Sequence, residues 1–92
     1  MNKRNIMQMK EEITEYVNNI DPWHLIEMGA PEDEYNRQID RIISLLVNKK
    51  PNREVLEYSL IEIFKTKEFE LENDKIKELA KSIDDYMKMQ SR

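Results

Sequence analysis

A chain of 92 residues has room for one hydrophobic core, and a single Gly and three Pro leave few places for helices to break. The absence of Cys excludes disulfides, thiolate nucleophiles and Cys-ligated zinc. The net charge is −4, and Lys and Arg are interleaved with Asp and Glu rather than gathered in a basic stripe. This charge pattern argues against nucleic-acid binding.

The first predicted helix covers residues 2–19. Its apolar residues recur at steps of three and four, which is the spacing of one buried helical stripe. That stripe is Ile6, Met9, Ile13, Tyr16, Val17 and Ile20. The basic N-terminus is not followed by the apolar run of a signal peptide, and no segment has the roughly 20 apolar residues of a membrane span. We therefore expect a soluble, cytoplasmic protein with no membrane partner.

A short helical turn is predicted next, from Pro22 to about Met28. Asp21 can cap the free amides of this turn, and Pro22 suits its first position. Gly29 is placed to end it, because Gly enters the left-handed region without steric cost.

Three further long helices follow. The second begins at Pro31, or after a cap at Asp33, and ends near Asn48 before Pro51. The third, capped by Asn52, covers residues 53–65, and the fourth covers residues 73–89. In the connection between the last two, Phe69 and Leu71 are expected to pack on the core.

The apolar spacing of these three helices predicts which side chains are buried. The second is expected to bury Tyr35, Ile39, Ile42, Ile43, Leu46 and Val47. The third is expected to bury Val55, Leu56, Leu60, Ile63 and Phe64, with Tyr58 and Ile61 off the stripe. The fourth is expected to bury Ile76, Leu79, Ala80, Ile83, Tyr86 and Met87.

The sequence thus predicts an all-α fold. We expect one domain over residues 1–92, an antiparallel four-helix bundle with a short extra helical turn between its first two helices. The six Met are expected mainly to fill gaps in the core, with Met7 among the exposed apolar residues.

The segment 21–35 is the most unusual part of the chain. It holds the only Trp, the only His and the only Gly, with two of the three Pro. Trp23 is interpreted as a core anchor, with a partner-binding role as the alternative. His24 lacks the other ligands that a zinc site needs. The carboxylates of the segment are interpreted as helix caps rather than as a cation site, because the spacing of a calcium-binding loop is absent.

This segment also carries a recognisable series of residues. Asp21-Pro22-Trp23, Leu25, Gly29-Ala30-Pro31 and Asp33-Glu34-Tyr35 form the pattern DPxxL…GAPxDEY. The pattern resembles that of a family of small, uncharacterised proteins of Bacillus-like bacteria, and Ile39, Ile42 and Leu45-Leu46 extend the resemblance. The resemblance implies a compact all-helical domain of unknown function and supplies no catalytic residue.

No catalytic set, metal site or cofactor site is predicted. The leading hypothesis is a non-enzymatic protein-interaction or regulatory module that binds an unknown protein or a second copy of itself. The alternatives are an acidic inhibitor or immunity-type protein that binds a basic partner, and an enzyme with a carboxylate site. The candidate interaction surface is Asp21, Trp23, His24, Glu32, Asp33, Glu34 and Tyr35.

Overall fold

A computed structural model describes residues 3–68 and 70–90 of the chain, with the side chain of residue 3 left out. Four helices form, and the described residues contain no strand. They are α1 (Lys3–Ile20), α2 (Asn36–Lys49), α3 (Arg53–Phe64) and α4 (Asn73–Gln90). The predicted all-α fold of a single four-helix domain is confirmed.

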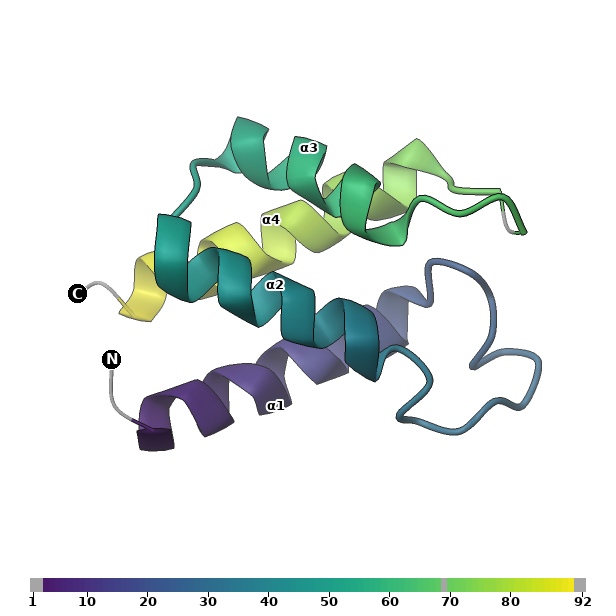
Figure 1. The fold of residues 1–92 in the computed structure, drawn as a ribbon, viewed down its shortest axis with the longest axis horizontal. Helices are drawn as coiled ribbons and strands as arrows, with labels where there is room; N and C mark the ends of the chain where they lie inside the picture. Colours follow the sequence, from purple (N-terminus) through teal and green to yellow (C-terminus); the bar gives the residue numbers. More distant parts are fainter. Residues whose placement is uncertain (1–2, 69, 91–92) are drawn as a thin grey trace.

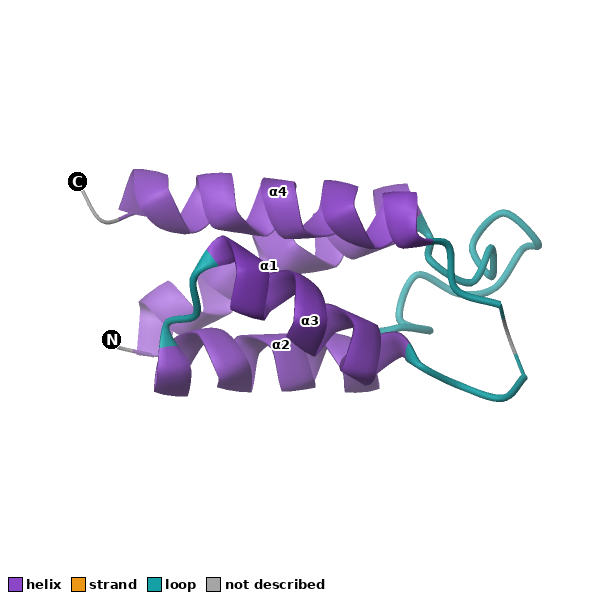
Figure 2. Cartoon of the chain, turned by 90° about the horizontal axis from the view of Figure 1, so that it is seen from above, coloured by secondary structure: helices purple, strands orange, loops and turns teal. Residues whose placement is uncertain are grey.

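Successive helices run in opposite directions (Figure 1). Each helix packs against its neighbours in the chain, and α1 also packs against α4, which closes the bundle. The two ends of the described chain and the short α2–α3 connection lie at one end of the molecule (Figure 2). The two longer connections, residues 21–35 and the described parts of 65–72, lie at the opposite end, which we call the loop end.

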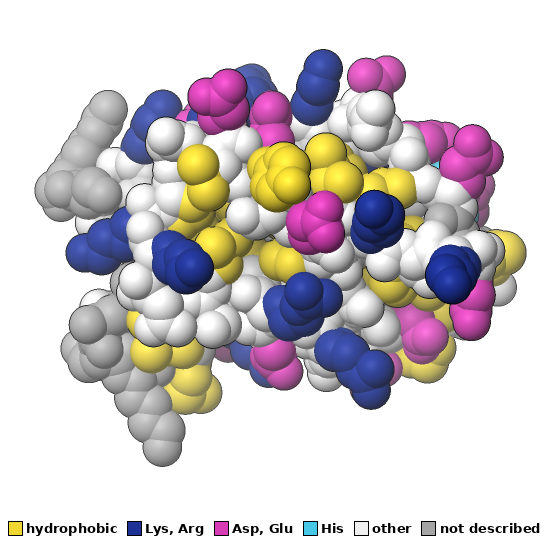
Figure 3. Space-filling model, turned by 45° about the horizontal axis from the view of Figure 1, so that its top comes forward, with side chains coloured by type: hydrophobic (Ala, Val, Ile, Leu, Met, Phe, Trp, Pro, Cys, Tyr) yellow, Lys and Arg dark blue, Asp and Glu magenta, His cyan; other side chains and the backbone are white. Residues whose placement is uncertain are grey.

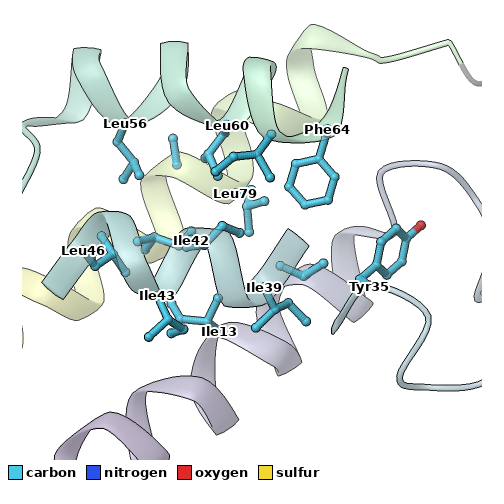
Figure 4. Packing of buried hydrophobic residues seen from close by; sticks show 14 of the residues in the cluster. Ile13, Tyr35, Ile39, Ile42, Ile43, Leu46, Leu56, Leu60, Phe64 and Leu79 are labelled. Atoms are coloured by element: carbon cyan, nitrogen blue, oxygen red, sulfur yellow. The ribbon is translucent and has the colours of Figure 1, made fainter. Parts of the chain in front are cut away.

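The core is built from one apolar face of each helix, as the periodicity predicted (Figure 4). Its fully buried members include Ile13 of α1, Ile42 of α2, Leu60 of α3 and Leu79 of α4. One stripe residue was assigned wrongly: Val55 is 48% exposed. The predicted role of Met is also wrong in part. Met9 is buried and Met7 is exposed, both as predicted, whereas Met28 and Met89 are exposed and do not fill the core.

The helix α3 begins and α2 ends as predicted. The Asn52 side chain accepts a hydrogen bond of 2.9 Å from the amide of Val55 and caps α3. At the end of α2, Lys50 takes a left-handed conformation immediately before Pro51. A proline at this position cannot continue the helix.

The start of α2 was predicted too early, because the helix begins at Asn36. The amides of Glu34 and Asn36 bond to the carbonyls of Pro31 and Asp33, three residues back, which makes successive turns instead of a helix. Tyr35 occupies the N-cap position and makes no side-chain cap there. Its ring enters the core instead.

The extra turn between α1 and α2 is shorter than predicted. It consists of one helical bond, from the amide of Met28 to the carbonyl of His24, and residues 22–28 are turns rather than a helix. Pro22 lies inside a tight turn closed by the His24 amide and the Asp21 carbonyl, so it is not a first helical residue.

The α3–α4 connection touches the core through Leu71, as predicted, whereas Phe69 lies outside the described residues. None of the helices in the described part of the chain is long and apolar enough to cross a membrane.

Candidate functional site

Asp21 ends α1 and organises the segment that follows. Its amide bonds to the carbonyl of Val17, and its φ of 52° places it in the left-handed region that closes a helix C-terminus. Asp tolerates this conformation better than most residues other than Gly. The residue is 8% exposed, and its carboxylate accepts the amides of Ile26 at 3.0 Å and Glu27 at 2.9 Å.

Tyr35 completes this network from the far end of the segment. Its hydroxyl donates to the Asp21 carboxylate at 2.6 Å and accepts the amide of Trp23 at 3.0 Å. The ring is fully buried beside Phe64, and its oxygen points away from the aliphatic core (Figure 4). The two ends of the segment 21–35 are therefore joined by buried polar contacts.

Burial and hydrogen bonding shift the pKa values of both groups. Burial alone would raise the pKa of Asp21. The hydrogen bonds from Tyr35, Glu27 and Ile26 outweigh it, with help from the Lys75 charge, and the pKa is lowered. Burial raises the pKa of Tyr35, and donation to the Asp21 carboxylate raises it further. At neutral pH the pair is a carboxylate and a neutral phenol.

Trp23 is held as an anchor. Its indole N–H donates to the carbonyl of Phe64 at 3.0 Å, which satisfies a backbone acceptor left open at the end of α3. Its ring lies 5.6 Å from the Tyr35 ring and 5.7 Å from the Phe64 ring, centroid to centroid. The anchor interpretation of Trp23 fits these contacts better than the partner-binding alternative.

Gly29 ends the turn as predicted. The amide of Ala30 bonds to the carbonyl of Leu25, and the amide of Gly29 bonds to the carbonyl of Ile26. These two bonds define a Schellman motif, in which the left-handed position belongs to Gly29 with φ of 96°.

His24 and Lys75 lie at the edge of this network. Lys75, from the first turns of α4, donates to the carbonyls of Ile20 and Asp21 at 3.1 and 3.2 Å. The imidazole Nδ1 of His24 lies 3.0 Å from the Glu27 carboxylate, and its Nε2 lies 3.7 Å from that of Glu72. Lys75 carried no sequence signal, because its partners lie more than fifty residues away.

The candidate surface is therefore divided. Asp21, Trp23 and Tyr35 meet in the interior network, whereas Glu32, Asp33 and Glu34 are exposed outside it. The backbone of Glu32 is tied to α1, since its carbonyl accepts the side-chain amide of Asn18 at 2.9 Å. Among the described residues, no group of three or more His, Asp or Glu side chains could hold a metal ion.

A second candidate surface lies between α2 and α3, and the candidate list from the sequence did not include it. A shallow groove of about 380 Å³, wide open to solvent, is lined there by Arg41, Ser44, Leu45, Tyr58, Ser59, Glu62 and Ile63. Tyr58 is 69% exposed at its edge, and the exposed Val55 lies one turn before it on α3. Figure 3 looks onto this face and shows a band of apolar side chains bordered by charged ones. The position of Tyr58 off the buried stripe was the available signal.

Comparison with known proteins adds no assignment: no protein family, curated protein or solved structure matches this chain. The resemblance to small bacterial proteins stays a prediction.

Proposed function

We propose that this chain is a small, cytoplasmic, non-enzymatic protein-interaction module, and that its binding face is the α2–α3 groove. The observation that carries the proposal is the exposure of Tyr58 and Val55 beside that groove. Tyr is among the residues enriched at protein interfaces, where it supplies a large apolar ring with a polar end. The neighbouring Ser and charged side chains give the groove a polar rim.

The contacts of the segment 21–35 support a structural role for its most distinctive residues. The acceptor capacity of Asp21 is engaged by two amides and one hydroxyl, and Trp23 donates its indole N–H inside the molecule. An enzyme would need a perturbed acid or base at a concave, accessible site. The groove is lined by neither Asp21 nor Tyr35, the pair with opposite pKa shifts.

Site-specific photo-cross-linking in cells tests the proposal. A benzophenone amino acid in place of Tyr58 should yield a discrete cross-linked species, because its ring would lie in the interface. The same amino acid in place of Glu78, an exposed residue of α4, is the matched control. No adduct at position 58, or equal adducts at both positions, would contradict the proposed face.

A second candidate function is inhibition of a basic protein. It is favoured by the acidic character of the end of the molecule that carries the two longer connections. Exposed carboxylates gather on the two connections there: Glu27, Glu32, Asp33, Glu34, Glu68, Glu70 and Glu72. Such a field steers association with cations and weakens as salt rises. Neutralising Glu32, Asp33 and Glu34 to amides should weaken binding of a labelled polyarginine peptide, whereas neutralising Glu11 and Glu15 of α1 should not. Equal loss from both sets would argue against this candidate.

A further inference from the structure

We propose that the occupant of the α2–α3 groove is the same groove of a second copy of this chain, in a weak two-fold symmetric dimer. This inference rests on the proposed function and names its partner.

The groove presents opposite charges on its two sides at the same end. Arg41 of α2 and Glu62 of α3 are both exposed, and both line the groove beside Ile63. The Arg41 guanidinium donates only a long bond of 3.5 Å to the Ile63 carbonyl. Within the described residues, neither Arg41 nor Glu62 has an oppositely charged side chain within 4.0 Å. Their charges remain available to a partner.

This arrangement is complementary to itself. A two-fold axis running along the groove exchanges its two sides, so the partner's α2 would lie over α3 of the first copy. Arg41 of each copy then faces Glu62 of the other, which makes two ion pairs across one interface. The same operation brings Leu45 over the partner groove's Tyr58 edge, so apolar surface is buried between the charged pairs.

A different two-fold arrangement is disfavoured by charge. If two α3 helices packed antiparallel about Tyr58, residues four before and four after it would face each other. Those residues are Glu54 and Glu62, and like charges at close range oppose association. The charges therefore select the arrangement that places α2 over α3.

The dimer should be weak. The α3 helix has 12 residues and is about 18 Å long. One such helix with a neighbouring groove gives an interface near the low end of specific protein contacts, about 1,000 Å² in total. We expect dissociation constants in the range of tens to hundreds of micromolar, on the order of those for transient contacts.

Exchange of the two charges gives a sharp test by sedimentation velocity with purified protein. Arg41→Glu and Glu62→Arg each place like charges across the dimer, so each variant alone should dimerise about five- to fiftyfold more weakly than the parent. An equimolar mixture of the two should regain dimerisation, because both interfacial pairs become complementary in the mixed dimer. Thermal melts monitored by circular dichroism verify that each variant is folded.

The mixture distinguishes contacts between two copies from effects within one copy. Each variant still carries two like charges at positions 41 and 62 in the mixture, so regained dimerisation can come only from contacts between chains. A parent protein that stays monomeric up to about 1 mM, or a mixture no better than its components, would overturn the inference. If cross-linking through position 58 then still traps a different protein, the proposed binding face stands and only its occupant is wrong. If it traps nothing, both proposals fail.

Discussion

Asp21 has two tasks that no other residue type performs together. Its backbone is left-handed, which Gly would allow, and its carboxylate accepts two amides and one phenol, which Gly could not do. Asn would keep the left-handed backbone but place a donor where one amide now donates. Asp21 therefore ends α1 and, through Tyr35, holds the start of α2 beside it.

Replacement of Asp21 by Asn should lower the free energy of unfolding by about 2–4 kcal/mol at pH 7, because charge-assisted hydrogen bonds are lost. The lowered pKa of Asp21 means that its contribution is present above its ordinary value of 3.8 and is lost as pH falls through the folded-state pKa. Urea unfolding of both proteins from pH 7 to pH 2.5 should show the gap between them narrowing below about pH 4. A gap that is independent of pH would contradict this role.

Gly29 offers a test of backbone conformation without packing effects. A Cβ at this position would meet nothing within 4 Å, so the cost of a side chain comes from the backbone alone. Gly29→Ala should destabilise the protein by about 1–2 kcal/mol, and Gly29→Asn by less, because Asn tolerates positive φ. Chemical denaturation of the two variants beside the parent measures this order. An Ala variant as stable as the Asn variant would refute the left-handed cap.

At the scale of the element, α3 is apolar on two faces. Leu56 and Leu60 face the core, and Tyr58 and Val55 face outward. Among the described residues, α1 and α4 each expose one large apolar side chain, Met7 and Met89, whereas α3 exposes two that lie one turn apart. An element with more apolar surface than its own fold covers is the natural place for a partner.

Neighbouring residues on α3 provide a matched pair of variants. Leu56→Ala should lower the free energy of unfolding by about 2–5 kcal/mol, because a fully buried side chain leaves a cavity. Val55→Ala should change it by less than about 1 kcal/mol, since nearly half of that side chain is exposed. Chemical denaturation at protein concentrations below the dimer dissociation constant checks both values. Similar losses of unfolding free energy for the two variants would contradict the orientation of α3.

Local pattern predicted the helices because their periodicity depends on residues three and four apart. It failed for Val55 because this residue lies at the edge of the apolar stripe of α3. A side chain at such an edge is buried only if a neighbouring helix covers it. Local pattern also failed for the length of the turn after α1 and for the start of α2, because the shape of the segment between them depends on contacts far apart in sequence. Tyr35 meets Asp21 across 14 residues, and Trp23 meets Phe64 across 41. Composition marked the segment as unusual, but only these contacts show that Asp21, Trp23 and Tyr35 find their partners inside the molecule.

At the scale of the whole molecule, the buried polar network and the proposed binding face occupy different regions. The loop end contains the polar network that joins the ends of α1 and α3 to the first turns of α4. The proposed binding face lies on the side of the bundle, over α2 and α3 (Figure 3). The two regions meet at the end of α3, where Ile63 lines the groove and the next residue, Phe64, accepts the Trp23 indole N–H.

A dilution series followed by two-dimensional ¹H–¹⁵N NMR tests this separation most directly. As the protein concentration rises, we expect amide shifts to change most at Leu45, Tyr58 and Glu62, whereas the single indole N–H signal of Trp23 changes much less. The Trp23 indole is a clear reporter because the chain has no other Trp. Concentration-dependent shifts confined to residues 21–35, with α2 and α3 unchanged, would contradict the assignment of the binding face.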